Sequence, residues 1–266
     1  MRRKFMRELA VMGLPRSPRP GADVAPVTGA DLQGLPDSVR RYLRFMRVEG
    51  RPRDWSFRIG FHGRFRRSER DRWMACEGWQ YNTRLALARI FHMRIRFFGV
   101  VPIYGRDTYA GGRGRMLVRP LDLVTIGDGK GEAYDIGELV TYLNDGIMIA
   151  PSMLLVPEVQ WSGVDAGSVG VSLSDHGRTV AARVFIDERG APVDFETTDR
   201  FYSDPDDASK VTRCRWTTPI TGYQEVGGRP LPIGGQAIWH PPGGDLAYAQ
   251  LTFDLSSIAF NVPPGG

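Results

Sequence analysis

The sequence predicts a mainly β protein of the α+β type: a large curved antiparallel sheet, or half-barrel, with an amphipathic helix packed in its concave face. Three observations predict this fold. Apolar and polar residues alternate with period two in both halves of the chain, tight-turn signals separate the alternating segments, and one long helical pattern lies between the halves. A chain of 266 residues is long enough to bury one sizeable core.

The first half of the chain changes to a period of two after Pro52. There Phe57, Ile59 and Phe61 alternate with polar or small side chains, which is the pattern of a half-buried strand. After this strand, which spans about residues 55–65, we expect further strands over residues 73–81, 91–97, 101–110 and 113–119.

The second half repeats the pattern. Asp175-His176-Gly177 and Glu188-Arg189-Gly190 are turn signals between alternating segments. We expect a loop over residues 204–207, and strands over residues 169–173, 179–186, 191–202, 212–218, 233–239 and 248–255. A sheet of roughly ten strands at such short spacing has to curl or close.

Two segments have helical spacing. Residues 37–46 follow a proline and begin with Asp37, a favourable N-cap. Residues 134–149 place Leu139, Leu143 and Ile147 on one side, and such an apolar stripe packs onto a sheet. We expect residues 35–266 to form one half-barrel domain. Residues 1–34 contain four prolines, and we expect them to form a flexible or loosely docked arm.

The charge and hydropathy patterns narrow the class of protein. The net charge is +5, the basic residues are spread along the strands, and no nucleic-acid motif accompanies them, so we expect no nucleic-acid partner. No apolar run is long enough to span a membrane. The basic start, Met1–Arg7, is not followed by the apolar core of a signal peptide, and we therefore expect a cytoplasmic protein.

The motifs of metal and cofactor sites are absent. Cys76 and Cys214 lie in no C-x-x-C pair and have no histidine at metal-ligand spacing, so we expect reduced cysteines, with a disulfide left open, and no metal. No common catalytic or nucleotide-binding motif occurs, and we expect no cofactor. The glycine-rich segment Gly127–Gly131 precedes a helix like a phosphate cradle, but it lacks the Walker spacing and is interpreted as a turn.

A first polar cluster lies on the expected strand 101–110. Alternation places Asp107 and Tyr109 on one face and Arg106 on the other. Asp107 and Tyr109 are candidate catalytic residues of a pocket wall, with the tyrosine donating a hydrogen bond to a ligand. The alternative is an Arg–Asp ion-pair network beside a packed tyrosine.

A second polar cluster lies on the central helix. Asp135, Glu138 and Tyr142 follow an i, i+3, i+7 spacing beside the apolar stripe. A carboxylic acid with a raised pKa beside a tyrosine can transfer protons, so these three are also candidate catalytic residues. The alternative is a solvated helix edge. Candidate ligand contacts around both clusters are Arg106, Met116, Leu139, Leu143, Trp161 and Trp239.

Four segments give the chain a resemblance to a known family. They are Leu35–Leu43, Gly105–Tyr109 with Gly112–Met116, Gly137–Leu143, and Leu231-Pro232 with Gly235–His240. Over about residues 35–260 the chain resembles a widespread bacterial family of unknown function, whose members resemble the LolA/LolB-like lipoprotein-carrier half-barrel. The resemblance implies a curved sheet with helices that plug an apolar cavity, and it supplies no catalytic residues.

These observations leave three hypotheses about function. The chain binds a hydrophobic small molecule or lipid in the half-barrel cavity. Alternatively, it is a cofactor-independent isomerase, cyclase or lyase that acts on an apolar metabolite with the acid and base groups named above; such chemistry needs only a shaped pocket and placed proton donors. The third hypothesis is an interaction protein with a solid core.

Overall fold

The computed structural model describes residues 1–19, 24–204 and 207–266. After three short helices, the described residues form the strands β1 (Ser56–Phe65), β2 (Met74–Thr83), β3 (Ala88–Phe97), β4 (Val101–Ala110), β5 (Arg113–Pro120) and β6 (Gly127–Lys130). After the central helix α4 (Glu132–Ile149) and a 3-10 turn, η1 (Pro151–Leu154), come β7 (Val159–Asp165), β8 (Ser168–Asp175), β9 (Arg178–Ile186), β10 (Pro192–Asp204) and β11 (Asp207–Thr217). The chain ends with β12 (Tyr223–Val226), β13 (Arg229–Pro232), β14 (Gly234–Trp239) and β15 (Leu246–Phe260).

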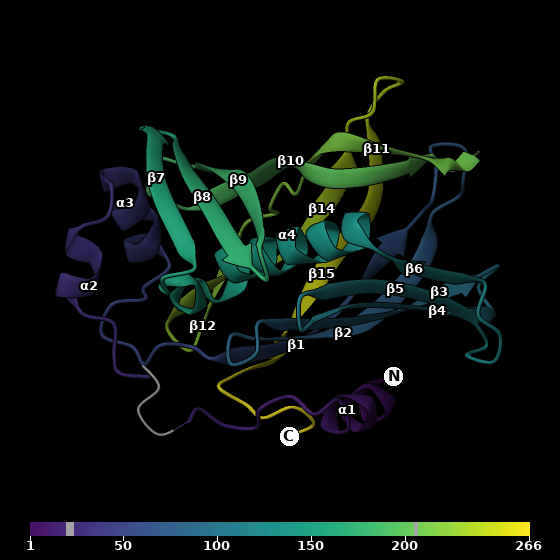
Figure 1. The fold of residues 1–266 in the computed structure, drawn as a ribbon, viewed down its shortest axis with the longest axis horizontal. Helices are drawn as coiled ribbons and strands as arrows, with labels where there is room; N and C mark the ends of the chain where they lie inside the picture. Colours follow the sequence, from purple (N-terminus) through teal and green to yellow (C-terminus); the bar gives the residue numbers. More distant parts are fainter. Residues whose placement is uncertain (20–23, 205–206) are drawn as a thin grey trace.

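One antiparallel sheet of 13 strands dominates the fold, in the order β6-β5-β4-β3-β2-β1-β15-β14-β11-β10-β9-β8-β7. Strands β1–β6 form the lower half in Figure 1, strands β7–β11 form the upper half, and β14 with β15 connects them. The helix α4 lies between the two halves (Figure 1). This curled sheet with a helix on its concave face confirms the predicted fold class.

The alternation of the sequence decides which side chains enter the space between sheet and helix. In β1, Phe57 and Ile59 belong to the same buried core as Leu139 and Leu143 of α4. Phe57 pairs with Asn82 of β2, and because directly paired residues project to the same side, even-numbered residues of β2 share this concave face. The hydrophobic core therefore fills the bend of the sheet around α4.

The helix α4 is buried on all sides beyond its first turn. Asp135, Glu138 and Tyr142 are 1%, 5% and 2% exposed, so the alternative of a solvated helix edge is wrong. The helix contacts β3–β6 on one side and β8–β10 on the other. A helix between two halves of a bent sheet has no face left for solvent, which the pattern of one apolar stripe did not indicate.

Two hairpin tips meet at the N-terminal end of α4 and join the halves of the sheet. Tyr109 Oη of β4 donates a hydrogen bond to Asp175 Oδ2 of β8 at 2.6 Å. Arg178 Nη1 of β9 donates to the Gly112 carbonyl oxygen at 3.1 Å. A Cβ on Gly112 would lie 2.5 Å from the His176 ring, so the close approach of the two tips requires glycine there. We call this junction the seam.

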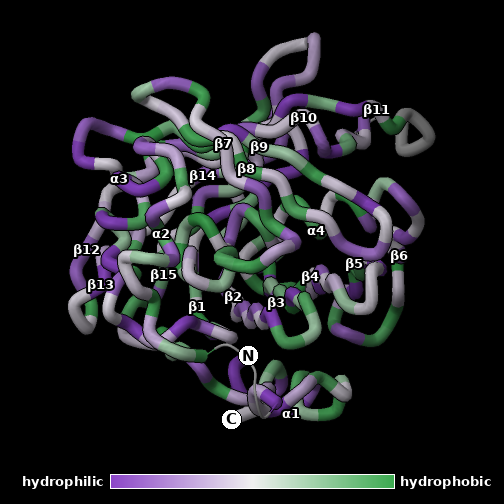
Figure 2. The backbone as a smooth tube through the Cα atoms, turned by 60° about the vertical axis from the view of Figure 1, so that its left-hand side comes forward, coloured by the Kyte–Doolittle hydropathy of each residue, from purple (hydrophilic) through white to green (hydrophobic). Residues whose placement is uncertain are grey.

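Three further helices cover the sheet. The helices α2 (Gly29–Gln33) and α3 (Asp37–Phe45) precede β1, and α3 packs on β7 and β8. Tyr42 Oη donates to the Ile147 carbonyl at 2.8 Å, which holds α3 against the C-terminal end of α4. The helix α1 (Arg2–Ala10) lies on the convex face beneath β1–β4, beside the C-terminus (Figure 2). There Phe5 and Leu9 are buried against Tyr81 and Ile90.

Several elements were not expected from the sequence. They are α1, α2, β6, β7 and the separate β12–β13 hairpin. The segment interpreted as a turn, Gly127–Gly131, contains the short edge strand β6. Its glycines are required because a Cβ on Gly129 would lie 2.1 Å from Tyr134 Cζ, so the strand leaves space for that ring. Part of the expected arm, residues 20–23, and part of the expected loop, residues 205–206, lie outside the described residues.

Candidate functional site

A group of charged side chains lies inside the fold, between α4 and the lower half of the sheet. Arg89 of β3 projects from the concave face and is 4% exposed. Its Nη1 donates to Glu138 Oε2 at 2.8 Å, and its Nε donates to Asp145 Oδ2 at 2.7 Å. The two carboxylates are seven residues apart on α4 and thus face the same side. One arginine therefore anchors two turns of the helix to the sheet.

Amide side chains extend this group along β2. Asn82 Nδ2 donates to Asp145 Oδ2 at 3.2 Å, and Gln80 Nε2 donates to Asn82 Oδ1 at 3.0 Å. Both amides are almost fully buried. A buried carboxylate is tolerated when donors surround it, and Asp145 has two of them here.

Asp107 and Arg200 complete the group but have no direct partner of their own. Asp107 of β4 faces the concave side beside Phe91, its paired residue on β3. Among the residues that the structure describes, Asp107 accepts no hydrogen bond, and Arg200 of β10 donates none and forms no ion pair. The charge of Arg200 nevertheless acts on Asp107 and lowers its pKa, against the larger effect of burial, which raises it. We call Arg89, Asp107, Glu138, Asp145 and Arg200 the charge cluster.

Arg200 stacks on aromatic rings. Its guanidinium carbon lies 4.3 Å from the centre of the Trp216 ring and 5.3 Å from that of Trp239. Trp239 also stacks on Tyr248, and Trp216 Nε1 donates to Tyr248 Oη at 3.2 Å. Tryptophan faces attract cations, so the rings hold the guanidinium over the concave face without using its hydrogen-bond donors.

Burial in the charge cluster raises the pKa of its acidic groups. Burial and the nearby Asp107 carboxylate raise the pKa of Glu138 to about 7, although Arg89 opposes the shift. Burial also raises the pKa of Asp107 and of Asp145, again against Arg89. Three carboxyl groups share two guanidinium groups, so a proton on one of the acids balances the charge. A carboxyl group with a pKa near neutrality can give or take a proton at physiological pH.

Two of the five candidate catalytic residues lie in the charge cluster, Asp107 and Glu138. The other three lie elsewhere. Asp135 belongs to the seam: its Oδ1 accepts a hydrogen bond from the Gly114 amide at 2.8 Å, and its Oδ2 pairs with Arg178 at 2.8 Å. Tyr109 also belongs to the seam, because it donates to Asp175. Tyr142 is buried on α4, and burial raises its pKa well above the usual value.

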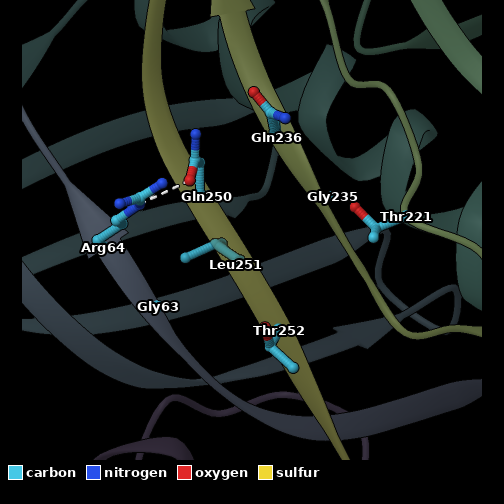
Figure 3. A pocket seen from close by; sticks show the side chains of 8 residues that line it. All are labelled: Gly63, Arg64, Thr221, Gly235, Gln236, Gln250, Leu251 and Thr252. Atoms are coloured by element: carbon cyan, nitrogen blue, oxygen red, sulfur yellow. Dashed lines mark hydrogen bonds between the residues drawn. The ribbon is translucent and has the colours of Figure 1, made fainter.

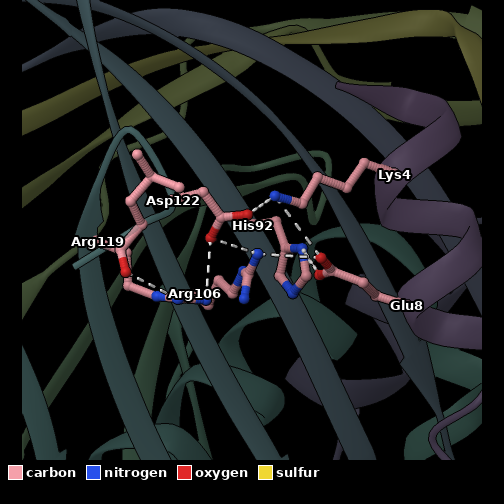
Figure 4. A network of polar contacts seen from close by, with 7 residues as sticks. Lys4, Glu8, His92, Arg106, Arg119 and Asp122 are labelled. Atoms are coloured by element: carbon pink, nitrogen blue, oxygen red, sulfur yellow. Dashed lines mark hydrogen bonds and ion pairs between the residues drawn. The ribbon is translucent and has the colours of Figure 1, made fainter. Parts of the chain in front are cut away.

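The candidate ligand contacts are also divided. Arg106 does not reach the concave face: it lies on the convex side and pairs with Glu8 of α1 and with Asp122. This network also contains Lys4, His92 and Arg119 (Figure 4). Leu139 and Leu143 are fully buried core residues, and Trp161 packs on Tyr42 of α3, away from the charge cluster. Met116 pairs with Asp107 and shares its face, and Trp239 contacts Arg200.

Sequence reasoning missed Arg89, Asp145 and Arg200. Arg89 stands among apolar residues where β3 begins, and Asp145 follows Glu138 by two helical turns on the same face. An arginine and a second acid in otherwise buried segments were the available signals. Arg200 gave no such signal, because β10 has polar residues on both sides and only the bend of the sheet brings it to α4.

Hollows lie near the middle of the sheet in the described part of the chain, and two of them bear on the site. One of about 320 Å³ lies over β1, β14 and β15, where Gly63 and Gly235 carry no side chains (Figure 3). Arg64 Nε bonds Gln250 Oε1 at its rim, at 2.6 Å. The second, of about 580 Å³, is lined by residues of β1, β2 and β15 and includes Phe61. The Phe61 ring stacks on Phe91, with centroids 4.7 Å apart, which connects this hollow to the aromatic side chains of the concave face.

The described residues contain no group of three or more histidine, cysteine or acidic side chains arranged to hold a metal ion. Cys76 and Cys214 are both buried and free. Burial raises the pKa of the Cys76 thiol to about 12, so it stays protonated. In the same described segments, no helix has the length and apolar character needed to cross a membrane.

Comparison with known proteins gives a family and distant structural neighbours. Residues 25–251 match a family described as a family of unknown function, DUF6544. No relative is found among the curated proteins. Four chains of solved structures match, among them the three that follow.

An outer-membrane lipoprotein-sorting domain from Vibrio parahaemolyticus has 9% identity and a TM-score of 0.43, covering 77% of this chain and 85% of its own. A LolA superfamily protein from Nitrosomonas europaea has 10% identity and a TM-score of 0.40, covering 82% and 90%. A DUF1329 family protein from Desulfovibrio piger has 9% identity and a TM-score of 0.45, covering 85% and 92%.

Proposed function

The chain belongs to the DUF6544 family, a family of unknown function, and we propose that it binds an apolar small molecule or lipid with a polar head group on its concave face. The apolar body lies against the aromatic side chains, and the head group lies between Arg200 and Asp107. This refines the expected hydrophobic ligand, because the bend of the sheet contains charges as well as rings.

The unpaired state of Arg200 is the observation that carries the proposal. Its Nε is buried and has no hydrogen-bond partner among the described residues. Arg200 as a whole is half-buried, but buried donors are almost always satisfied, so the buried Nε without a partner needs an explanation. A ligand carboxylate or phosphate supplies one, because the guanidinium fork binds either with two parallel hydrogen bonds.

The surroundings of Arg200 suit the remainder of such a ligand. Phe91, Trp239 and Tyr248 are half-buried on the concave face, so each still presents ring surface. Asp107 offers a carboxyl group with a raised pKa, which can donate to an oxygen of the head group when protonated. Ligand sites commonly combine an apolar lining with a few placed polar groups in this way.

A second candidate function is acid–base catalysis on the bound molecule. It rests on the pKa of Glu138, raised to about 7, in a group that also contains Asp107. One carboxyl group near neutrality and a second beside it can pass a proton between two positions of a substrate, as isomerisation or cyclisation requires. Arg89, which holds Glu138 in place, acts as a positioning residue in this scheme.

The experiment for binding is native mass spectrometry of the purified full chain, followed by extraction of any bound molecule. The expected result is an added mass that Arg200→Met reduces by at least about tenfold in occupancy. Arg183→Met is the matched control, because Arg183 also stacks on a ring, Phe185, but lies on β9 with 42% of its side chain exposed. Equal occupancy in both variants contradicts the proposal.

The extracted molecule then separates the two functions. We expect it to be recovered unchanged after incubation with the wild-type chain if the protein only binds it. Conversion that is lost in Glu138→Gln but kept in Arg183→Met supports catalysis. Conversion that Glu138→Gln leaves intact removes this residue from the scheme.

A further inference from the structure

A cluster of exposed apolar side chains lies at one end of the lower half of the sheet, outside the proposed binding site. Exposure runs from 37% at Val101 to 84% at Phe98. These side chains come from the β3–β4 turn and the β5–β6 loop, and we call them the apolar tip: Phe97, Phe98, Val100, Val101, Leu121, Leu123, Val124 and Ile126.

The two loops form one surface because β4 pairs with both β3 and β5. Phe97 pairs with Val101, and Ile103 pairs with Pro120. The Leu121 amide donates to the Pro102 carbonyl at 2.8 Å, which ties the loops together. Both reach the same end of the lower half (Figure 1). Contiguous exposed apolar surface of this kind marks a place of interaction.

The backbone turns these side chains outward at a cost. Phe98, Leu121 and Asp122 have φ angles of 48°, 52° and 60°, in the left-handed region that favours glycine. Phe98 is 84% exposed, and the Phe97 ring that it contacts is itself 41% exposed, so burial offsets little of this strain. Strained non-glycine residues cluster at functional sites, so the strain is a second observation that points to the tip.

Basic side chains lie beside the apolar tip. Arg96, next to Phe97, has 52% of its side chain exposed and shares Glu77 with Arg94, and Arg3 and Arg7 of α1 are also exposed. The acid inside the β5–β6 loop, Asp122, is neutralised: it pairs with Lys4, Arg106 and Arg119 (Figure 4). The Lys4–Asp122 pair also brings α1, with its arginines, beside the loop. The surface is therefore apolar at its tip and positive at its rim.

We propose that the apolar tip inserts into the surface of an anionic lipid bilayer, with the basic rim on the phosphate head groups. Apolar side chains gain free energy at the acyl boundary, and arginines near the surface are attracted to anionic lipids, so the two groups act together. A second copy of the chain fits less well, because each copy brings a net charge of +5 and the same basic rim.

The apolar tip also lies at the end of an apolar row on the concave face. Phe91, Met93, Ile95 and Phe97 are alternate residues of β3 and project to one side. They form an apolar line from Asp107, which pairs with Phe91, to the tip. A bilayer at the tip thus lies at one end of the surface on which we place the ligand, although membrane docking stands on the exposed loops alone.

The test is sedimentation of the full chain with vesicles of phosphatidylcholine, with and without phosphatidylglycerol. We expect binding only to the vesicles that contain phosphatidylglycerol, and weaker binding at raised salt, which screens the arginines. Phe98→Asp with Val124→Asp is expected to reduce the bound fraction about tenfold. Val164→Asp is the matched control, since Val164 is 52% exposed on β7, at the other edge of the sheet. This variant is expected to bind the vesicles as the wild type does.

Unfolding curves of all variants show whether each is folded, and exposed loop positions are expected to leave stability unchanged. Absence of binding by wild type, or equal binding by the loop variant and wild type, overturns the proposal. A concentration-dependent dimer that the loop variant abolishes, without vesicle binding, assigns the tip to a second copy instead.

Discussion

Arg89 reaches from β3 to Glu138 of α4 and forms with it an ion pair whose two side chains are only 5% and 7% exposed. The pair is one of several contacts between the first strands of the chain and the helix that fills their bend. Because Arg89 also holds Asp145, its removal leaves two buried carboxylates without their cation. Much of the chemistry of the interior depends on this single side chain.

Arg89→Met is therefore expected to lower the free energy of unfolding by about 3–5 kcal/mol, the usual cost of leaving a buried charge unpaired. Urea denaturation measures the change. The control is Arg115→Met, which breaks an exposed pair with Asp128 and is expected to cost at most about 1 kcal/mol. Similar losses in both variants contradict a special role for the buried pair.

Glu138 makes the stability depend on pH. Its pKa in the fold, about 7, lies above its ordinary value of 4.5, so the folded state binds more protons than the unfolded state between these values. Stability from this group is therefore full below pH 4.5 and is lost as the pH rises through about 7. Glu138→Gln is expected to flatten this fall, measured as the free energy of unfolding against pH. A wild-type slope that the variant reproduces shows that other groups cause it.

The seam is expected to contribute to stability through Tyr109. Tyr109→Phe removes the hydroxyl that donates to Asp175 and is expected to cost about 1.5–3 kcal/mol, the usual value for a hydrogen bond to a charged group. Tyr104→Phe is the control on the same strand, because Tyr104 lies on the convex face and its hydroxyl makes no hydrogen bond within the described residues. An equal loss of unfolding free energy in the two variants contradicts a stabilising role for the Tyr109–Asp175 hydrogen bond.

The docked α1 helix is expected to keep His92 uncharged. Burial, with Arg106 and Lys4 nearby, lowers the pKa of His92 from 6.5 to about 3, so the unfolded state takes up the proton first as the pH falls. Stability from this site is present above pH 6.5 and is lost towards pH 3. Phe5→Asp, which loses the ring contact with His92, is expected to raise that pKa towards 6.5 in an NMR titration. Val11→Asp changes an exposed position just after α1 and is the control. It is expected to leave the pKa of His92 unchanged if the docking of α1 on the sheet causes the shift.

Most of the strand predictions rested on the local alternation of apolar and polar residues. The segment 101–110 was predicted with the bounds of β4, because its alternation is regular and glycines follow it at once. Alternation also placed Asp107 and Tyr109 on one face and Arg106 on the other, as the structure has them. The pattern has no information about which face becomes concave, so Arg106 was placed among the ligand contacts although it lies beneath α1.

The individual strands, the central helix and the acids that the helix carries could be predicted from the sequence, because each depends on residues close together in the chain. Tertiary structure alone decided that Glu138 meets Arg89, 49 residues away, and that Arg200 lies beside Gly137 on the far side of the bend. Those contacts depend on the curl of 13 strands around one helix, and a side chain's partners across such a bend leave no periodic trace in the sequence.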